Sequence, residues 1–176
     1  MFLGRRCLLL ASLALALMPT SVLAREPGDG VAWIHFPCQK SAKHPRWGEF
    51  LTDLETHLPQ QYKKDFQADD PIVHAHETTH GINAHIRNLY ALKLQRVNSF
   101  YVGKDKAVVF PEPNVKLAQV ADLVPAPLRK QRYKLYLVKQ QKDWNNEPLY
   151  VFDEWNAYVN GAAAGIELAN NKLYQP

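Results

Sequence analysis

The chain has 176 residues, two cysteines and a formal net charge of +4 at pH 7. One cysteine lies within a signal-like N-terminal segment, which excludes a disulfide framework in the mature chain. The small net charge implies no particular partner, and the length is enough for one domain with one core.

The first 24 residues have the pattern of a cleaved secretory signal. Two arginines precede an almost unbroken apolar run, Leu8–Met18, and small residues lead up to Ala24. The run is too short to cross a bilayer comfortably, which argues against a stable membrane anchor. We therefore expect residues 1–24 to be removed and residues 25–176 to form a single secreted or periplasmic domain.

Hydrophobic periodicity and turn residues predict a small, helix-rich α+β fold. The expected elements in chain order are a strand at Val31–Phe36, a helix from Pro45 to Leu58, a long helix at Ile72–Leu94, strands at Ser99–Val102 and Ala107–Phe110, and helices at Val115–Leu123, Pro127–Lys142 and Pro148–Leu168. Asp70 and Pro71 are start signals for the long helix, and the two middle strands are expected to form a hairpin.

Two of these helices have a defined expected core face. The expected buried residues are Ile72, Ala75, Thr79, Ile82, Ile86 and Leu89 in the first, and Leu128, Tyr133, Leu135, Tyr136 and Val138 in the second. The densest basic group also falls in the second segment and comprises Arg129, Lys130, Arg132, Lys134, Lys139 and Lys142. Because apolar residues interrupt this group, we interpret it as a solvated helix face and not as a nucleic-acid-binding surface.

The run His76-Glu77-Thr78-Thr79-His80 is the strongest functional signal in the chain. Residues four apart lie on one face of a helix, so both imidazoles can hold a single zinc ion. Glu77 lies about 100° around the helix from His76, where its carboxylate can take a proton from water and pass it to a leaving amine. A zinc site of this kind has a third protein ligand and one open position.

Glu154 is the preferred candidate for the third ligand. It lies in an expected helix among aromatic and apolar residues, where an acid is costly to bury unless it binds a cation or is paired. Asp153 is the alternative, either as the ligand itself or as the partner that orients a ligand histidine.

The remaining histidines are weaker candidates. His74 and His85 belong to the motif helix but are expected to point away from the ligand face. Spacing alone leaves open His35, His44 and His57.

Several other residues can support the site. Asn83 and Arg87 share the ligand face one and two turns on, and Arg87 can pair with an acid of the last helix. Tyr150 and Tyr158 lie one turn before and after the third-ligand candidate and can reach the site as oxyanion donors, although packing alone is the commoner role for a buried tyrosine. The hairpin at 99–110 can serve as an edge strand for an extended peptide.

The motif resembles the active-site helix of the zincin metallopeptidases, and a glutamate on a later helix is similar to the gluzincin arrangement. The resemblance implies that His76, His80 and Glu154 bind Zn²⁺ and that Glu77 is the general base. It covers two short helical segments. The positions of the additional metzincin glycine and histidine hold other residues, and the thermolysin-type pattern around the distal glutamate is absent, so the subfamily stays open.

These observations predict a zinc-dependent peptidase with a compact zincin-like domain. Its expected substrate is a peptide or protein, with a cell-wall peptide as one option, and nucleic acid is not an expected partner. The alternative is a non-catalytic zinc-binding or protein-interaction module on a zincin-like scaffold. Competing chemistries lack their motifs, since the sequence has neither a glycine-rich phosphate loop nor a Gly-x-Ser-x-Gly turn.

Overall fold

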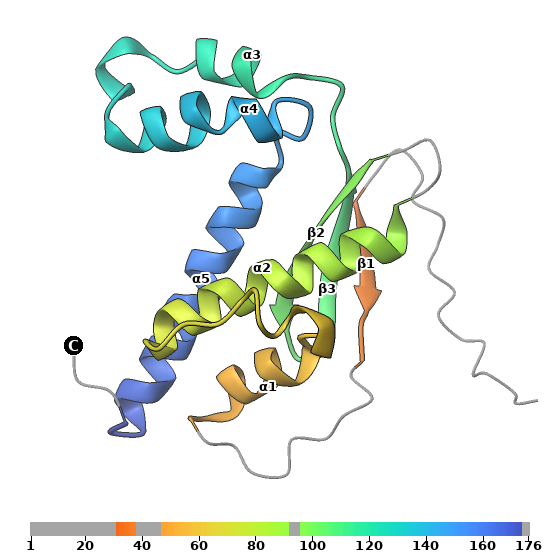
Figure 1. The fold of residues 1–176 in the computed structure, drawn as a ribbon, viewed down its shortest axis with the longest axis vertical. Coiled ribbons are helices and arrows are strands. Elements are labelled where there is room, and N and C mark those ends of the chain that lie inside the picture. Colours follow the sequence, from red (N-terminus) through yellow and green to blue (C-terminus); the bar gives the residue numbers. More distant parts are fainter. Residues whose placement is uncertain (1–30, 38–46, 92–95, 174–176) are drawn as a thin grey trace, which may run out of the picture.

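The computed structural model describes residues 31–37, 47–91 and 96–173, and Figure 1 shows their arrangement. The elements are β1 (Ala32–His35), α1 (Glu49–His57), the 3₁₀ turn η1 (Gln60–Tyr62), α2 (Pro71–Tyr90), β2 (Val97–Gly103), β3 (Lys106–Pro111), α3 (Leu117–Asp122), the 3₁₀ turn η2 (Ala126–Leu128), the π-helix η3 (Tyr133–Lys139), α4 (Gln141–Trp144) and α5 (Tyr150–Asn170). The expected signal segment, Cys38, His44 and Pro45 lie outside the described residues.

The α+β prediction is confirmed: helices surround one small antiparallel sheet with strand order β1-β3-β2. The predicted hairpin is β2–β3, and its turn consists of Lys104 and Asp105, both with positive φ (54° and 59°). Two consecutive residues of this conformation give the hairpin turn that matches the natural twist of the strands. Among the described residues, none of the helices has the length and apolar character needed to span a membrane.

Helix α2 begins where the sequence predicts. The Asp70 carboxylate accepts hydrogen bonds from the backbone N–H groups of Ile72 and Val73, both at 2.9 Å, and Pro71 occupies the first turn. Four of the six expected core residues, Ala75, Thr79, Ile82 and Ile86, are fully buried. The prediction for Leu89 is wrong, because this residue lies in the last turn, where the helix leaves the core, and is 58% exposed.

Helices α2 and α5 pack closely because α5 has glycine at two contact positions. A Cβ atom on Gly165 would lie 2.8 Å from Cδ1 of Ile72, and one on Gly161 would lie 3.1 Å from the Ile72 carbonyl oxygen. A larger residue at Gly161 would press on the α2 backbone, and one at Gly165 would force the Ile72 side chain to move. This close approach allows polar side chains of α2 and α5 to meet between the helices.

Residues 117–144 form a separate lobe, at the top of Figure 1, which covers the beginning of α5 and lies away from α1. The prediction of one regular helix with a buried face is wrong here. The segment is divided into η2, η3 and α4, and Leu128, Leu135 and Val138 are exposed. Within the lobe Leu117 and Ala121 of α3 are buried, but no other element covers Leu128, Leu135 and Val138.

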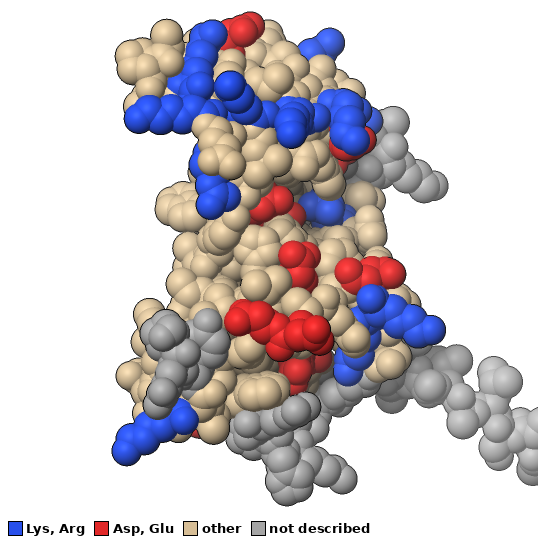
Figure 2. All heavy atoms as spheres, turned by 60° about the vertical axis from the view of Figure 1, so that its left-hand side comes forward, with Lys and Arg blue, Asp and Glu red and all other residues tan. Residues whose placement is uncertain are grey.

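The basic residues of this 117–144 lobe are exposed, as expected for a solvated face. Figure 2 shows their side chains gathered over the lobe, while acidic side chains gather below it on the same face of the molecule. The two charge signs therefore meet at the junction between the lobe and the body of the domain.

Candidate metal centre

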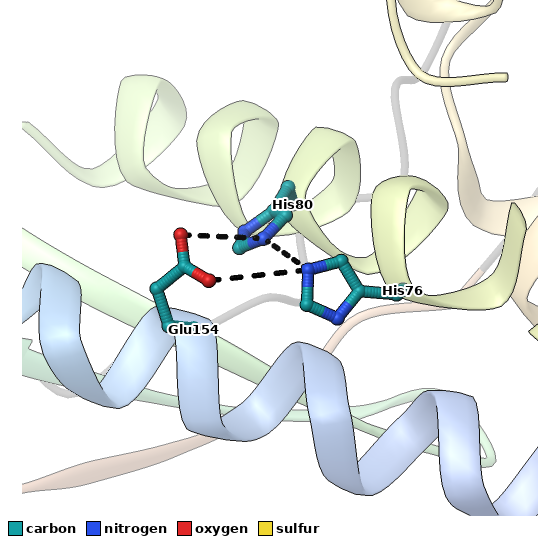
Figure 3. A group of neighbouring side chains, drawn as sticks. All are labelled: His76, His80 and Glu154. Atoms are coloured by element: carbon teal, nitrogen blue, oxygen red, sulfur yellow. Dashed lines mark hydrogen bonds and ion pairs between the residues drawn. The ribbon is translucent and has the colours of Figure 1, made fainter. Parts of the chain in front are cut away.

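The structure brings His76, His80 and Glu154 together between α2 and α5 (Figure 3). The Nε2 atoms of the two imidazoles are 3.1 Å apart, and each lies 3.9 Å from an oxygen of the Glu154 carboxylate. Two ligand atoms at tetrahedral angles around one zinc ion, each about 2.0–2.1 Å from it, are roughly 3.3 Å apart. The three side chains therefore fit a single small divalent cation with little movement.

Asp153 orients one of these imidazoles. Its Oδ2 accepts a hydrogen bond from His80 Nδ1 at 2.9 Å, so the proton is held on Nδ1 and Nε2 is turned towards the other ligand atoms. Its Oδ1 accepts from Asn83 Nδ2 at 2.5 Å. Of the two roles that the sequence leaves open for Asp153, this geometry matches the partner of a ligand histidine, while the neighbouring Glu154 faces both imidazoles.

A network of side-chain amides fixes these helices to β2. Asn83 is fully buried and its Oδ1 accepts from the Tyr101 backbone N–H at 2.7 Å. The Tyr101 carbonyl accepts from Nδ2 of Asn156 at 3.0 Å and of Asn160 at 2.9 Å. The outer edge of β2 at Tyr101 is thus already satisfied from α2 and α5, so this position of the hairpin does not offer an edge for an extended peptide.

Sequence reasoning missed Asn156 and Asn160. With Asp153 they recur at positions i, i+3 and i+7 of α5, and this polar stripe is the signal that predicts their shared face.

The charges at the centre are strongly coupled. Burial lowers the pKa of His76, and the neighbouring His80 lowers it further. Burial also opposes charge on His80, but its hydrogen bond to Asp153 and the nearby carboxylates raise its pKa overall. Burial raises the pKa of Glu154, although the charge of His80 partly offsets this. Glu77, Asp153 and Glu154 thus concentrate negative charge in a half-buried space, which favours a divalent cation.

Glu77 stands beside this group, as its place on the helix predicts. Its charge acts on the pKa of both imidazoles and of Glu154. With His76 it lines a cavity of about 250 Å³, together with Ile72, Val73, Tyr158 and Gly161. The cavity gives a small ligand access to both side chains.

A larger hollow of about 390 Å³ lies between β2, β3 and α5. It is lined by Phe100, Val108, Phe110, Leu149, Phe152, Trp155, Asn156 and Val159. None of these side chains is an acid, a base or a nucleophile, so we place the chemistry at the smaller cavity.

The two tyrosines considered as donors have different surroundings. The Tyr158 ring lies against the His76 ring, with centroids 4.6 Å apart, so Tyr158 belongs to the site. The Tyr150 hydroxyl donates to the Tyr136 carbonyl at 2.5 Å and is used to hold the 117–144 lobe. Arg87 donates to Asn98 at 3.2 Å and stacks on Trp144, and these contacts replace the pairing with an acid of α5 that the sequence leaves open.

The other histidines considered as ligands lie elsewhere. His85 packs between the Phe36 and Tyr62 rings, and His74 Nε2 is 3.2 Å from Glu55. His35 is exposed on β1, and His44 lies outside the described residues.

His57 belongs to a second acidic group near the β2–β3 turn. Its Nε2 is 2.7 Å from Asp105 Oδ1, and its Nδ1 is 2.7 Å from the Asp53 carbonyl oxygen. The Asp53 carboxylate in turn accepts from the Tyr101 hydroxyl at 2.9 Å. These atoms already satisfy one another and tie α1 to the turn, so the group has a structural explanation.

Comparison of the chain with family models, with curated proteins and with solved structures found no match. The interpretation of the centre rests on the geometry and chemistry of its own residues.

Proposed function

We propose that this protein is a zinc-dependent peptidase of zincin-like fold. The observation that carries the proposal is the convergence of His76, His80 and Glu154 on one point, with Glu77 beside them and an adjacent cavity. Two imidazoles and one carboxylate form a donor set that is typical of catalytic zinc. The proposal includes export of the chain by a signal segment at residues 1–24.

The residues divide the chemical work. His76, His80 and Glu154 would hold the zinc ion, which when bound polarises a carbonyl group and lowers the pKa of water. Glu77 takes the proton that water loses during attack on the peptide carbonyl and delivers it to the departing amine. Asp153 and Asn83 keep the His80 ring in the orientation that this chemistry needs.

Zinc content and hydrolysis together test the proposal. The full chain, purified after export, is expected to contain one zinc ion by elemental analysis and to cleave members of a random peptide library. His80→Ala and Glu154→Ala should lose most of the zinc. His85→Ala is the matched control, because it removes a histidine of the same helix that faces Phe36 and Tyr62.

Two outcomes would contradict the proposal. If the wild-type protein contains no stoichiometric zinc, or if His80→Ala retains it, the metal site is misassigned. If zinc is bound but no peptide is cleaved, the protein is the non-catalytic module instead. The same conclusion follows if a chelator removes the zinc and leaves any observed cleavage unchanged.

Asp153→Asn is expected to weaken zinc binding about 10–100-fold without abolishing it. The Asp153 carboxylate accepts hydrogen bonds on both oxygens, from His80 and from Asn83, whereas an asparagine can accept on only one. One donor therefore loses its partner and the imidazole is held less firmly. Competition with a chelator of known affinity measures the change, with the exposed Asp143→Asn as control. Unchanged affinity would show that the imidazole needs no such support.

A further inference from the structure

Arg132 lies at the rim of the metal centre and is held there by two tyrosines. Its Nη1 donates to the hydroxyl of Tyr136 at 3.2 Å and to that of Tyr158 at 3.1 Å. Its Cζ lies 5.8 Å and 5.7 Å from the centres of the same two rings. An exposed arginine is normally free to move, but these contacts give its guanidinium a defined position.

The same tyrosines connect Arg132 to the proposed ligands. The Tyr158 ring packs on the His76 ring, and the hydroxyls of Tyr158 and Tyr136 are 2.8 Å apart. The Tyr150 hydroxyl fixes the Tyr136 backbone to the start of α5, close to Glu154 in sequence. The 117–144 lobe is therefore anchored so that it holds Arg132 against the hydroxyl of Tyr158, a residue that lines the cavity.

Arg132 forms no close ion pair among the described residues, although its charge acts on the pKa of Glu154. Within the part of the chain that the structure describes, no carboxylate lies within 4 Å of its guanidinium, whereas Arg96 pairs with Glu147 at 3.2 Å. Burial and the hydrogen bond with Tyr158 raise the pKa of Tyr136 to about 12, so this phenol stays uncharged at neutral pH. Only one guanidinium nitrogen is used by the tyrosines, which leaves donors for an anion.

We infer that Arg132 binds a carboxylate of the substrate close to the cleaved bond. The proposed substrate class is peptides that carry a free C-terminal carboxylate or an acidic side chain near that bond. This inference rests on the proposed function, because it assigns specificity to the same centre.

The distribution of charge also determines which part of such a substrate faces Arg132. Figure 2 shows acidic side chains on the body of the domain below the basic 117–144 lobe. Glu77 and Asp153 are the carboxylates whose charge acts on His76, and they repel an anion. The 117–144 lobe contains six Lys or Arg and two Asp, a net charge of +4, which equals the net charge of the whole chain. An anionic group is therefore drawn to the Arg132 side, and the uncharged peptide bond is left facing Glu77.

Cleavage profiling of peptide libraries tests the inference. One library has free C-termini and a second has amidated C-termini, and each is made with Glu or with Gln at the acidic positions. For one of the two kinds of carboxylate, the wild-type protein is expected to have a kcat/KM about 10–100-fold higher than for the matching amide. This is the range for a hydrogen bond to a charged group. The amidated and Gln arms show whether the carboxylate is terminal or in a side chain.

Variants assign that preference to Arg132. Arg132→Ala should remove the preference, and Arg132→Lys should restore part of it. Lys134→Ala is the matched control, because it removes the same charge from an exposed position two residues away and should leave the preference intact. Equal cleavage of acid and amide forms by the wild type, or an unchanged preference in Arg132→Ala, would overturn the inference while leaving the peptidase proposal in place.

A binding measurement separates the two proposals if no peptide is cleaved. Zinc-loaded Glu77→Gln protein is titrated with the acid and amide forms of the same library in a calorimeter. Tighter binding of the acid form that is lost in the Arg132→Ala double variant supports the carboxylate site even without hydrolysis. Equal affinity for the two forms, or no binding of either, overturns it.

Discussion

Glu77→Gln is expected to lower kcat/KM for peptide hydrolysis about 10²–10⁴-fold while one zinc ion stays bound. Glutamine keeps the size and polarity of the side chain but cannot accept a proton from water at neutral pH. Glu77 lies beside the proposed ligands and not among them, so the zinc content should not change. Initial rates on a cleaved peptide, with elemental analysis of the same sample, give both quantities.

The control for this variant is Glu55→Gln. Glu55 contacts α2 through His74, so the Glu55→Gln substitution removes a carboxylate next to the same helix but outside the centre. Its rate should match that of the wild type. Equal rates for wild type and Glu77→Gln would favour the non-catalytic module, and loss of zinc in Glu77→Gln would mean that this glutamate is a ligand.

The elements that the sequence predicts well are those with a local signal. Helix α2 has a capping aspartate, a proline in its first turn and a regular apolar stripe, so its start is predicted correctly. The hairpin likewise follows from two β-prone runs with a short turn between them. The proximity of Glu154 to the motif histidines is not a local property of the sequence. It was expected because an acid among aromatic and apolar residues is costly to bury unless it binds a cation or is paired.

The 117–144 lobe could not be predicted in the same way. Its sequence has good helix-forming residues and apolar side chains at helical spacing, which predict a buried face. Burial depends on whether another element covers that face, and a periodic pattern holds no information about this. Leu128 is 65% exposed as a result. The position of Arg132 beside Tyr158 could not be predicted for the same reason.

The amide network around Tyr101 was also hidden, since single asparagines carry little sequence signal. The sequence predicts that Asn83 shares the ligand face, but its partners come from a strand and from another helix. Only the packed structure shows that the Asn83 side chain contacts both Asp153, which orients the proposed ligand His80, and the backbone of Tyr101 at the edge of the sheet.

Asn83→Ala is therefore expected to destabilise the fold by roughly 3–5 kcal/mol and to weaken zinc binding as well. The change leaves the Tyr101 N–H and one Asp153 oxygen without their partner in a buried interface. Urea unfolding of the zinc-free protein measures the first effect and chelator competition the second. Asn88→Ala is the control, because Asn88 is exposed on the same helix and loses only its surface hydrogen bond to the Tyr62 hydroxyl, which should cost no more than about 1 kcal/mol. A similar small loss for both variants would show that water replaces the Asn83 amide, and that the sheet and the metal centre are not joined through this residue.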